Sequence, residues 1–237
     1  SHSSAASDVY KRQLLHHLYA KLRFTLSKPI YKNMLENIAN LSNFKGMEYF
    51  ILLMIGTVTY DGLRGTTFWY NLFGSSTLDI TFSTFAFFGI NIVIIGSYRF
   101  ACWFALKVSG EKQDLNNISL LFGHTMLPIA FAYHVTHYLS LLLYESQTIL
   151  YRLNDPYGIG WNLFGINDVS INYFLTPVAL WGIQVFVTLA GHMLSVVLAH
   201  DLAIKLFGHQ QSDKTQYIFL LITVGLTLQA LFVLSVP

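Results

Sequence analysis

The chain has 237 residues, of which 54% are hydrophobic and 11% are charged, and its formal net charge is +2. A soluble domain carries about 25% charged residues, so this composition, with a mean hydropathy of +0.49, indicates a polytopic membrane protein. The small net charge argues against nucleic acid as a partner, and the single Cys102 rules out an internal disulfide.

The first 45 residues differ in character from the rest of the chain. Residues 3–13, SSAASDVYKRQ, resemble a translated sequencing adapter, so we expect residues 1–13 to be an artefact or a disordered tail. Residues 14–45 mix basic residues with apolar ones at helical spacing, which predicts a cytoplasmic amphipathic helix on the inner leaflet. The end of a preceding span is the alternative. Residues 46–237 then form a transmembrane domain, which we expect to be a fragment of a larger protein.

Five hydrophobic stretches are candidates for membrane-spanning helices, because a helix needs about 20 apolar residues to cross a bilayer. These stretches predict an all-α, polytopic transmembrane helix bundle. Pro128 lies inside the third of them, and its missing N–H predicts a kink there. The predicted spans are Met47 to Asp61, Ile80 to Leu106, Ser119 to Tyr144, Tyr173 to Leu206, and Gln216 to Val236.

The basic residues of the connections predict the orientation. One side carries Lys21, Arg23, Lys28, Lys32, Lys45, Arg99, Lys107, Lys112, Lys205 and Lys214, and the other side carries Arg64 and Arg152. Cytoplasmic loops are enriched in Lys and Arg. We therefore expect a multi-pass protein of the plasma membrane with its N-terminus inside and its C-terminus outside.

Ionisable residues inside the predicted spans mark a candidate site, because such groups are costly in hydrocarbon and are usually functional. At 1.5 Å per residue, His134 and His192 lie at similar depths, past the middle toward the outer side. His137 shares a helix face with His134, and Asp61 ends the first span at the same side. His200 and His124 form a second pair nearer the cytoplasm.

Imidazole and carboxylate are ligands for zinc and other divalent transition metals. A metal held by these residues is one interpretation, and hydrogen bonding across the bundle to partners such as Gln184, Thr136 and Ser195 is another. A proton or solute pathway is a third. A single haem between His134 or His137 and His192 is a further alternative, whereas His192 and His200 are too close along one helix for two stacked haems.

Four ordered segments carry a resemblance to a known family: GTVTYDGLRGTTFW, LPIAFAYHVTHYLSLLLYESQ, DPYGIGWNLFG and GHMLSVVLAHDLAIKLFG. From Ile51 to Pro237 the chain resembles the C-terminal half of a multi-pass membrane protein family common in actinobacteria, whose members are often labelled fenitrothion hydrolase. The resemblance implies that an upstream half of the protein is missing. His134 departs from the family pattern. The pattern falls on Asp61 and Gly62, His137 and Tyr138, Asp155 and Pro156, Gly191 and His192, and His200 and Asp201.

These residues are compatible with two functions from different classes. The resemblance implies a metal-dependent hydrolase of organophosphate type, with His137 and His192 as ligands, joined by His134 and His200, and with Asp61 as ligand or general base. The alternative is a non-enzymatic membrane protein that handles a metal ion, a proton or a small solute through the same polar layer. Neither the sequence nor the resemblance identifies the small-molecule substrate.

Overall fold

A computed structural model describes residues 44–237 apart from 75, 77–78, 167 and 236–237, so the predictions for residues 1–43 lie outside the described residues. The described residues form helices and no strand, which confirms the all-α fold. The helices are α3 (Met47–Arg64), α4 (Thr67–Phe73), α5 (Ile80–Ser109), α6 (Leu115–Thr125), α7 (Leu127–Leu143), the 3₁₀ helix η2 (Glu145–Thr148), α8 (Ile149–Asn154), α9 (Pro177–Phe207) and α10 (His209–Ser235).

Among the described residues, three helices are long and apolar enough to cross a membrane, or four if a bent pair counts as one span. They are α5, α9 and the Lys214–Ser235 part of α10, and the bent pair is α6 with α7. Their boundaries agree with predicted spans two to five within a few residues, except that α10 begins earlier, at His209. The chain is therefore a polytopic helical membrane protein.

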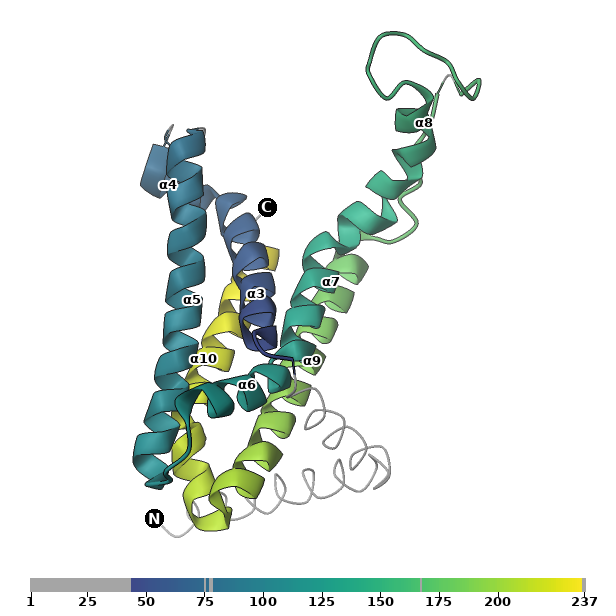
Figure 1. The fold of residues 1–237 in the computed structure, drawn as a ribbon. Coiled ribbons are helices and arrows are strands. Elements are labelled where there is room, and N and C mark those ends of the chain that lie inside the picture. Colours follow the sequence, from purple (N-terminus) through teal and green to yellow (C-terminus); the bar gives the residue numbers. More distant parts are fainter. Residues whose placement is uncertain (1–43, 75, 77–78, 167, 236–237) are drawn as a thin grey trace, which may run out of the picture. The chain divides into compact units, whose positions relative to one another are not determined.

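The remaining predicted span is α3, which differs from the others. It is a helix of 18 residues that carries Glu48, Asp61 and Arg64, and it is not among the helices that qualify as spans by length and composition. It lies between α5 and α7 (Figure 1) and also contacts α6 and α10. Ile55 and Val58 on α3 are completely buried. Its neighbours therefore shield α3 on several sides.

The third span is broken where the sequence predicts a kink. Helix α6 ends at Thr125, α7 begins at Leu127, and the two axes are bent by 45°. Pro128 sits in the first turn of α7, where its missing N–H costs no hydrogen bond. The backbone N–H of Ile129 donates to the hydroxyl of Ser195 on α9 over 3.0 Å. A side chain from a neighbouring helix thus caps the start of α7.

Aromatic rings join the helices at the end of the bundle where α9 turns into α10. Phe122 of α6 stacks between Phe207 of α9 and Phe219 of α10, with centroid distances of 6.2 and 4.6 Å. Tyr98 of α5 meets Phe219 edge-on at 5.9 Å. Figure 1 shows the end of α5 at this same end of the bundle. The connection after α5, which contains Lys112, and the first turns of α10, which contain Lys214, therefore lie on one side, as the charge pattern predicts.

Candidate functional site

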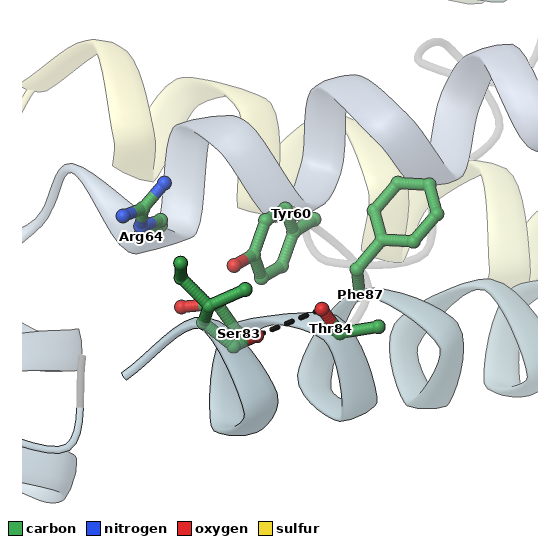
Figure 2. Close-up of a pocket in the computed structure, with 6 residues that line it drawn as sticks. Tyr60, Arg64, Ser83, Thr84 and Phe87 are labelled. Carbon is green, nitrogen blue, oxygen red and sulfur yellow. Dashed lines mark hydrogen bonds between the residues drawn. The ribbon is translucent and has the colours of Figure 1, made fainter. Parts of the chain in front are cut away.

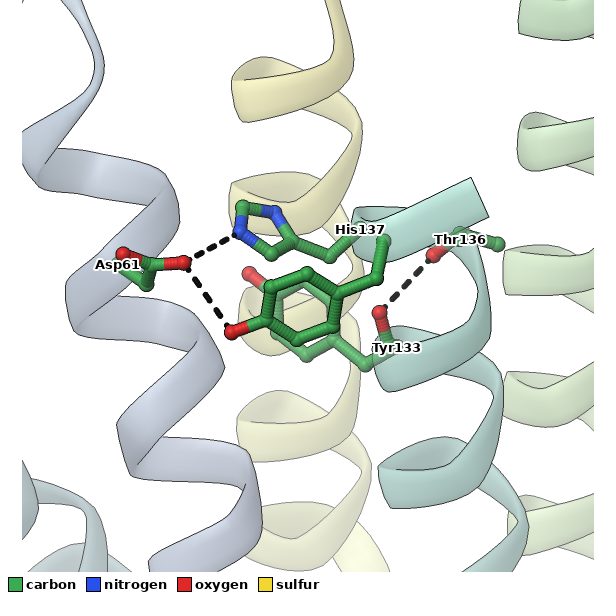
Figure 3. A network of polar contacts seen from close by, with 5 residues as sticks. Asp61, Tyr133, Thr136 and His137 are labelled. Carbon is green, nitrogen blue, oxygen red and sulfur yellow. Dashed lines mark hydrogen bonds and ion pairs between the residues drawn. The ribbon is translucent and has the colours of Figure 1, made fainter. Parts of the chain in front are cut away.

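The structure brings Asp61 of α3 and His137 of α7 into direct contact. The Nε2 atom of His137 lies 2.9 Å from Oδ2 of Asp61 (Figure 3). The His137 side chain is 17% exposed and the Asp61 side chain is 48% exposed. Gly62 permits this approach, because a Cβ there would lie 2.8 Å from the Val233 side chain and 3.5 Å from the His137 ring. The pair thus forms where α3, α7 and α10 come together.

Tyr138 completes this group, although sequence analysis assigned it no role. Its hydroxyl donates to the same Oδ2 atom of Asp61 over 3.1 Å. The rings of His137 and Tyr138 meet edge-on, with their centroids 4.7 Å apart. The side chains of neighbouring residues on a helix point about 100° apart. His137 and Tyr138 nevertheless reach the same carboxylate oxygen, because Asp61 lies between the two directions. The resemblance placed Tyr138 beside His137 in the family pattern but gave it no role.

Asp61, His137 and Tyr138 form what we call the acid–imidazole group, and its chemistry depends on its donors and acceptors. Asp61 accepts hydrogen bonds from the imidazole and from the phenol, so one carboxylate oxygen serves two donors. The imidazole and the phenol each carry a hydrogen toward this carboxylate, and the carboxylate keeps the ring oriented.

A second polar layer lies one helical turn from His137 along α7. Tyr133 of α7 donates a short hydrogen bond to Oε1 of Gln229 on α10. Thr59 of α3 donates to the same oxygen over 3.3 Å. The Nε2 atom of Gln229 is buried and has no hydrogen-bond partner among the described residues. This layer joins the same three helices as the acid–imidazole group.

The other predicted site residues, His134, His192 and His200, form hydrogen bonds outside the acid–imidazole group. The Nδ1 atom of His134 lies 2.9 Å from the carbonyl oxygen of Ala130 in its own helix. Nδ1 of His192 lies 2.9 Å from the Thr227 hydroxyl, and Nδ1 of His200 lies 3.1 Å from Oε1 of Gln216. His192 and His200 are thus hydrogen-bonded from α9 to α10. Of the five predicted residues, the structure joins Asp61 and His137 directly.

A metal centre would need more ligands than this pair. No group of three or more His, Cys, Asp or Glu residues that could hold a metal ion occurs among the described residues. Catalytic zinc sites use three protein ligands and keep a fourth position open. Asp61 and His137 supply two such side chains.

A pocket opens between α3 and α5. One of its lining residues, Tyr60, directly precedes Asp61 of the acid–imidazole group. Its volume is about 350 Å³. Figure 2 shows Tyr60 and Arg64 of α3 facing Ser83, Thr84 and Phe87 of α5. The rings of Tyr60 and Phe87 meet edge-on at 5.6 Å. The lining thus combines a guanidinium group, hydroxyls and aromatic rings.

The connection after α8 is ordered by two side chains. Buried Asn154 donates to Asn162 and to the carbonyl of Ile166, each over 2.8 Å. Asp155 accepts from the backbone N–H groups of Ile159 and Gly160. Desolvation raises the pKa of Asp155, but hydrogen bonds from backbone N–H groups, those of Gly160 and Ile159 foremost, bring the pKa below its ordinary value. The connection therefore has a defined conformation outside the spans.

Comparisons with protein-family models, curated proteins and solved structures gave no match to this chain. The resemblance to the family labelled fenitrothion hydrolase therefore stays a prediction from sequence motifs. The contacts within this chain are the basis for assigning its function.

Proposed function

We propose that this membrane protein binds and releases protons at the acid–imidazole group and belongs to the transport or binding class. The observation that carries the proposal is the hydrogen bond between Asp61 and His137, which joins two helices of the bundle. Ionisable residues in such positions are costly and are retained mainly where they serve ion or proton movement.

The exposure of the two side chains supports proton exchange with water. Asp61 is about half exposed and His137 is largely covered. A proton that reaches the Asp61 carboxylate can therefore pass to the His137 imidazole, which lies deeper in the protein. Tyr133, four residues before His137, lies on the same face of α7. Its hydroxyl and that of Thr59 meet at Gln229. These groups extend the polar contacts inward from the acid–imidazole group.

Proton flux into vesicles tests this function. The full-length protein would be reconstituted with a trapped pH-sensitive dye, and a pH gradient would be imposed. We expect Asp61→Asn and His137→Gln to reduce proton entry to the level of protein-free vesicles. Glu145→Gln is the matched control, because that carboxylate pairs with Arg152 at the surface, away from the group, and should leave the flux unchanged. Equal flux in the wild-type protein and both site variants would refute the proposal.

Metal-dependent hydrolysis is the second candidate, and one feature of the pair favours it. Asp61 engages Nε2 of His137, which leaves Nδ1 as the ring atom available to a metal. Histidine ligands commonly donate their other ring N–H to a carboxylate. In this function Asp61 would orient the ligand and the metal would activate water. The resemblance supplies the expected substrate class, an organophosphate ester.

Metal analysis of the purified full-length protein separates the two functions. About one metal per chain in the wild-type protein, lost in His137→Ala and accompanied by turnover of a phosphotriester, would support the hydrolase. Proton flux that persists after dialysis against a chelator would support proton handling without metal. His192→Ala serves as a comparison, because this residue bonds to Thr227 instead.

A further inference from the structure

The pocket between α3 and α5 uses a different face of α3 from the acid–imidazole group. Tyr60 and Arg64 are four residues apart and therefore share one face of the helix, whereas Asp61 bonds across to α7. Figure 2 shows Tyr60 and Arg64 extending from α3 toward α5. The volume of about 350 Å³ is in the range of sites for small molecules. The pocket is thus a separate candidate binding site.

Arg64 carries a charge that no described residue neutralises. The charge pattern predicts two basic residues on the outer side, Arg64 and Arg152. Arg152 pairs with Glu145 over 3.2 Å. The other ion pair among the described residues joins Asp61 to His137, so Arg64 has no carboxylate partner in that part of the chain. A guanidinium group has N–H donors and no acceptor. The exposed donors of Arg64 are therefore available to an anion.

Tyr60 places a second donor at the pocket. Its ring meets Trp69 and Phe87 edge-on, at 6.1 and 5.6 Å, and its hydroxyl forms no hydrogen bond within the described part of the chain. These two ring contacts orient the phenol. Across the pocket, the Thr84 hydroxyl donates its hydrogen to the carbonyl oxygen of Ile80 over 2.7 Å. The donors that have no partner among the described lining residues therefore belong to α3.

Two carboxylates lie near the pocket in sequence, and both have other partners. Asp61 accepts hydrogen bonds from two side chains of α7. Asp79 accepts from two backbone N–H groups at the start of α5, over 2.7 and 3.4 Å. The positive end of the α5 dipole lies at the same place and offsets part of the Asp79 charge. Neither carboxylate forms an ion pair with Arg64 among the described residues. The guanidinium group therefore stays open to a ligand.

We propose that this pocket binds an oxyanion, the carboxylate or phosphate group of a small molecule or of a lipid headgroup, through Arg64 and Tyr60. The planar guanidinium group suits two oxygens of one such anion, and the phenol adds a further hydrogen bond. The ring of Phe87 on α5 lines the pocket and can cover the apolar part of the ligand.

A purely stabilising role for Arg64 is the alternative. The residue lies in the last turn of α3, where a basic side chain interacts favourably with the helix dipole. In that case its replacement would lower the stability of the protein and leave ligand binding unchanged. A binding measurement therefore separates the two roles.

Titration calorimetry on the full-length protein in neutral detergent tests the proposal, with benzoate and inorganic phosphate as probes. We expect saturable binding of at least one probe by the wild-type protein and none by Arg64→Gln. Tyr60→Phe removes only the hydroxyl and should weaken binding about tenfold, because a hydrogen bond to a charged group is lost. Arg152→Gln is the matched control and should bind normally, since that guanidinium group already pairs with Glu145.

Mass spectrometry of lipids retained after purification distinguishes the two sources of the oxyanion. An anionic phospholipid that is present in the wild-type protein and in Arg152→Gln, but absent from Arg64→Gln, would assign the site to a headgroup. Binding of neither probe together with no Arg64-dependent lipid would overturn the inference. If Arg64→Gln does not fold, unchanged probe affinity and lipid retention in Tyr60→Phe would also overturn it. These measurements use no pH gradient, so their outcome is independent of the proton-flux experiment.

Discussion

Gly191 of α9 shows how a single residue sets the distance between two helices. A Cβ at this position would lie 2.3 Å from Cβ of Ala132 and 2.9 Å from the carbonyl oxygen of Pro128, both on α7. Small residues at such contacts let helix backbones approach closely in membranes. Gly182 on the same helix has nothing within 4 Å of an added Cβ among the described residues. The two glycines therefore differ in what a methyl group would meet.

We predict that Gly191→Ala destabilises the protein, whereas Gly182→Ala does not. Overpacking of a tight contact costs about 1–3 kcal/mol, because α7 and α9 would have to separate or shift. The free energy of unfolding in detergent, measured by denaturant titration, compares the two variants with the wild-type protein. Equal stability of both variants would mean that α7 and α9 do not approach as closely as described.

At the scale of elements, the break between α6 and α7 is stabilised from outside both helices. Ile129 begins the hydrogen bonding of α7 by donating to Ser195, and helix caps of this type are worth about 1 kcal/mol. We predict that Ser195→Ala lowers the free energy of unfolding by about that amount. Ser97→Ala is the control, because its hydroxyl donates to Ile94 of its own helix. A cost no greater than that of the control would mean that the Ser195 hydroxyl does not stabilise the start of α7.

Several elements could be predicted from the sequence because hydropathy and proline act locally. The long apolar helices and the kink before Pro128 result from composition and backbone chemistry. Depth along the helices predicted that Asp61 and His137 lie at one level. Depth alone does not give the direction in which a side chain points around its helix. For this reason the partners of His192 and His200 on α10, and the role of Tyr138, were not predicted.

Glu48 escaped sequence analysis for a related reason. It stands at the start of a predicted span, where charged residues normally reach water at the membrane surface. Its burial results from the return of α6 across the start of α3, where Gly123 admits the glutamate backbone. That contact joins residues 75 positions apart in the chain. Only tertiary packing could reveal it.

For the whole molecule, the distribution of basic residues predicts which end faces the cytoplasm. Cys102 is completely buried, so Cys102→Ala gives a cysteine-free background for labelling. In intact cells, we expect a membrane-impermeant maleimide to modify Tyr157→Cys. Glu111→Cys, in the connection after α5, should react only after the membrane is permeabilised. Modification of both positions in intact cells would contradict the predicted orientation.

The character of α3 also bears on how the protein enters the membrane during synthesis. Helices partition into lipid one at a time when they are long and apolar enough, which takes about 20 apolar residues. Helix α3 carries Glu48 near its start and Asp61 and Arg64 near its end, so its uncharged stretch is limited to residues 49–60. Its shielding neighbours α5, α6, α7 and α10 are all synthesised after it. We therefore expect α3 to wait at the translocation machinery until these later helices emerge. Its insertion would then be a cooperative event that completes the bundle.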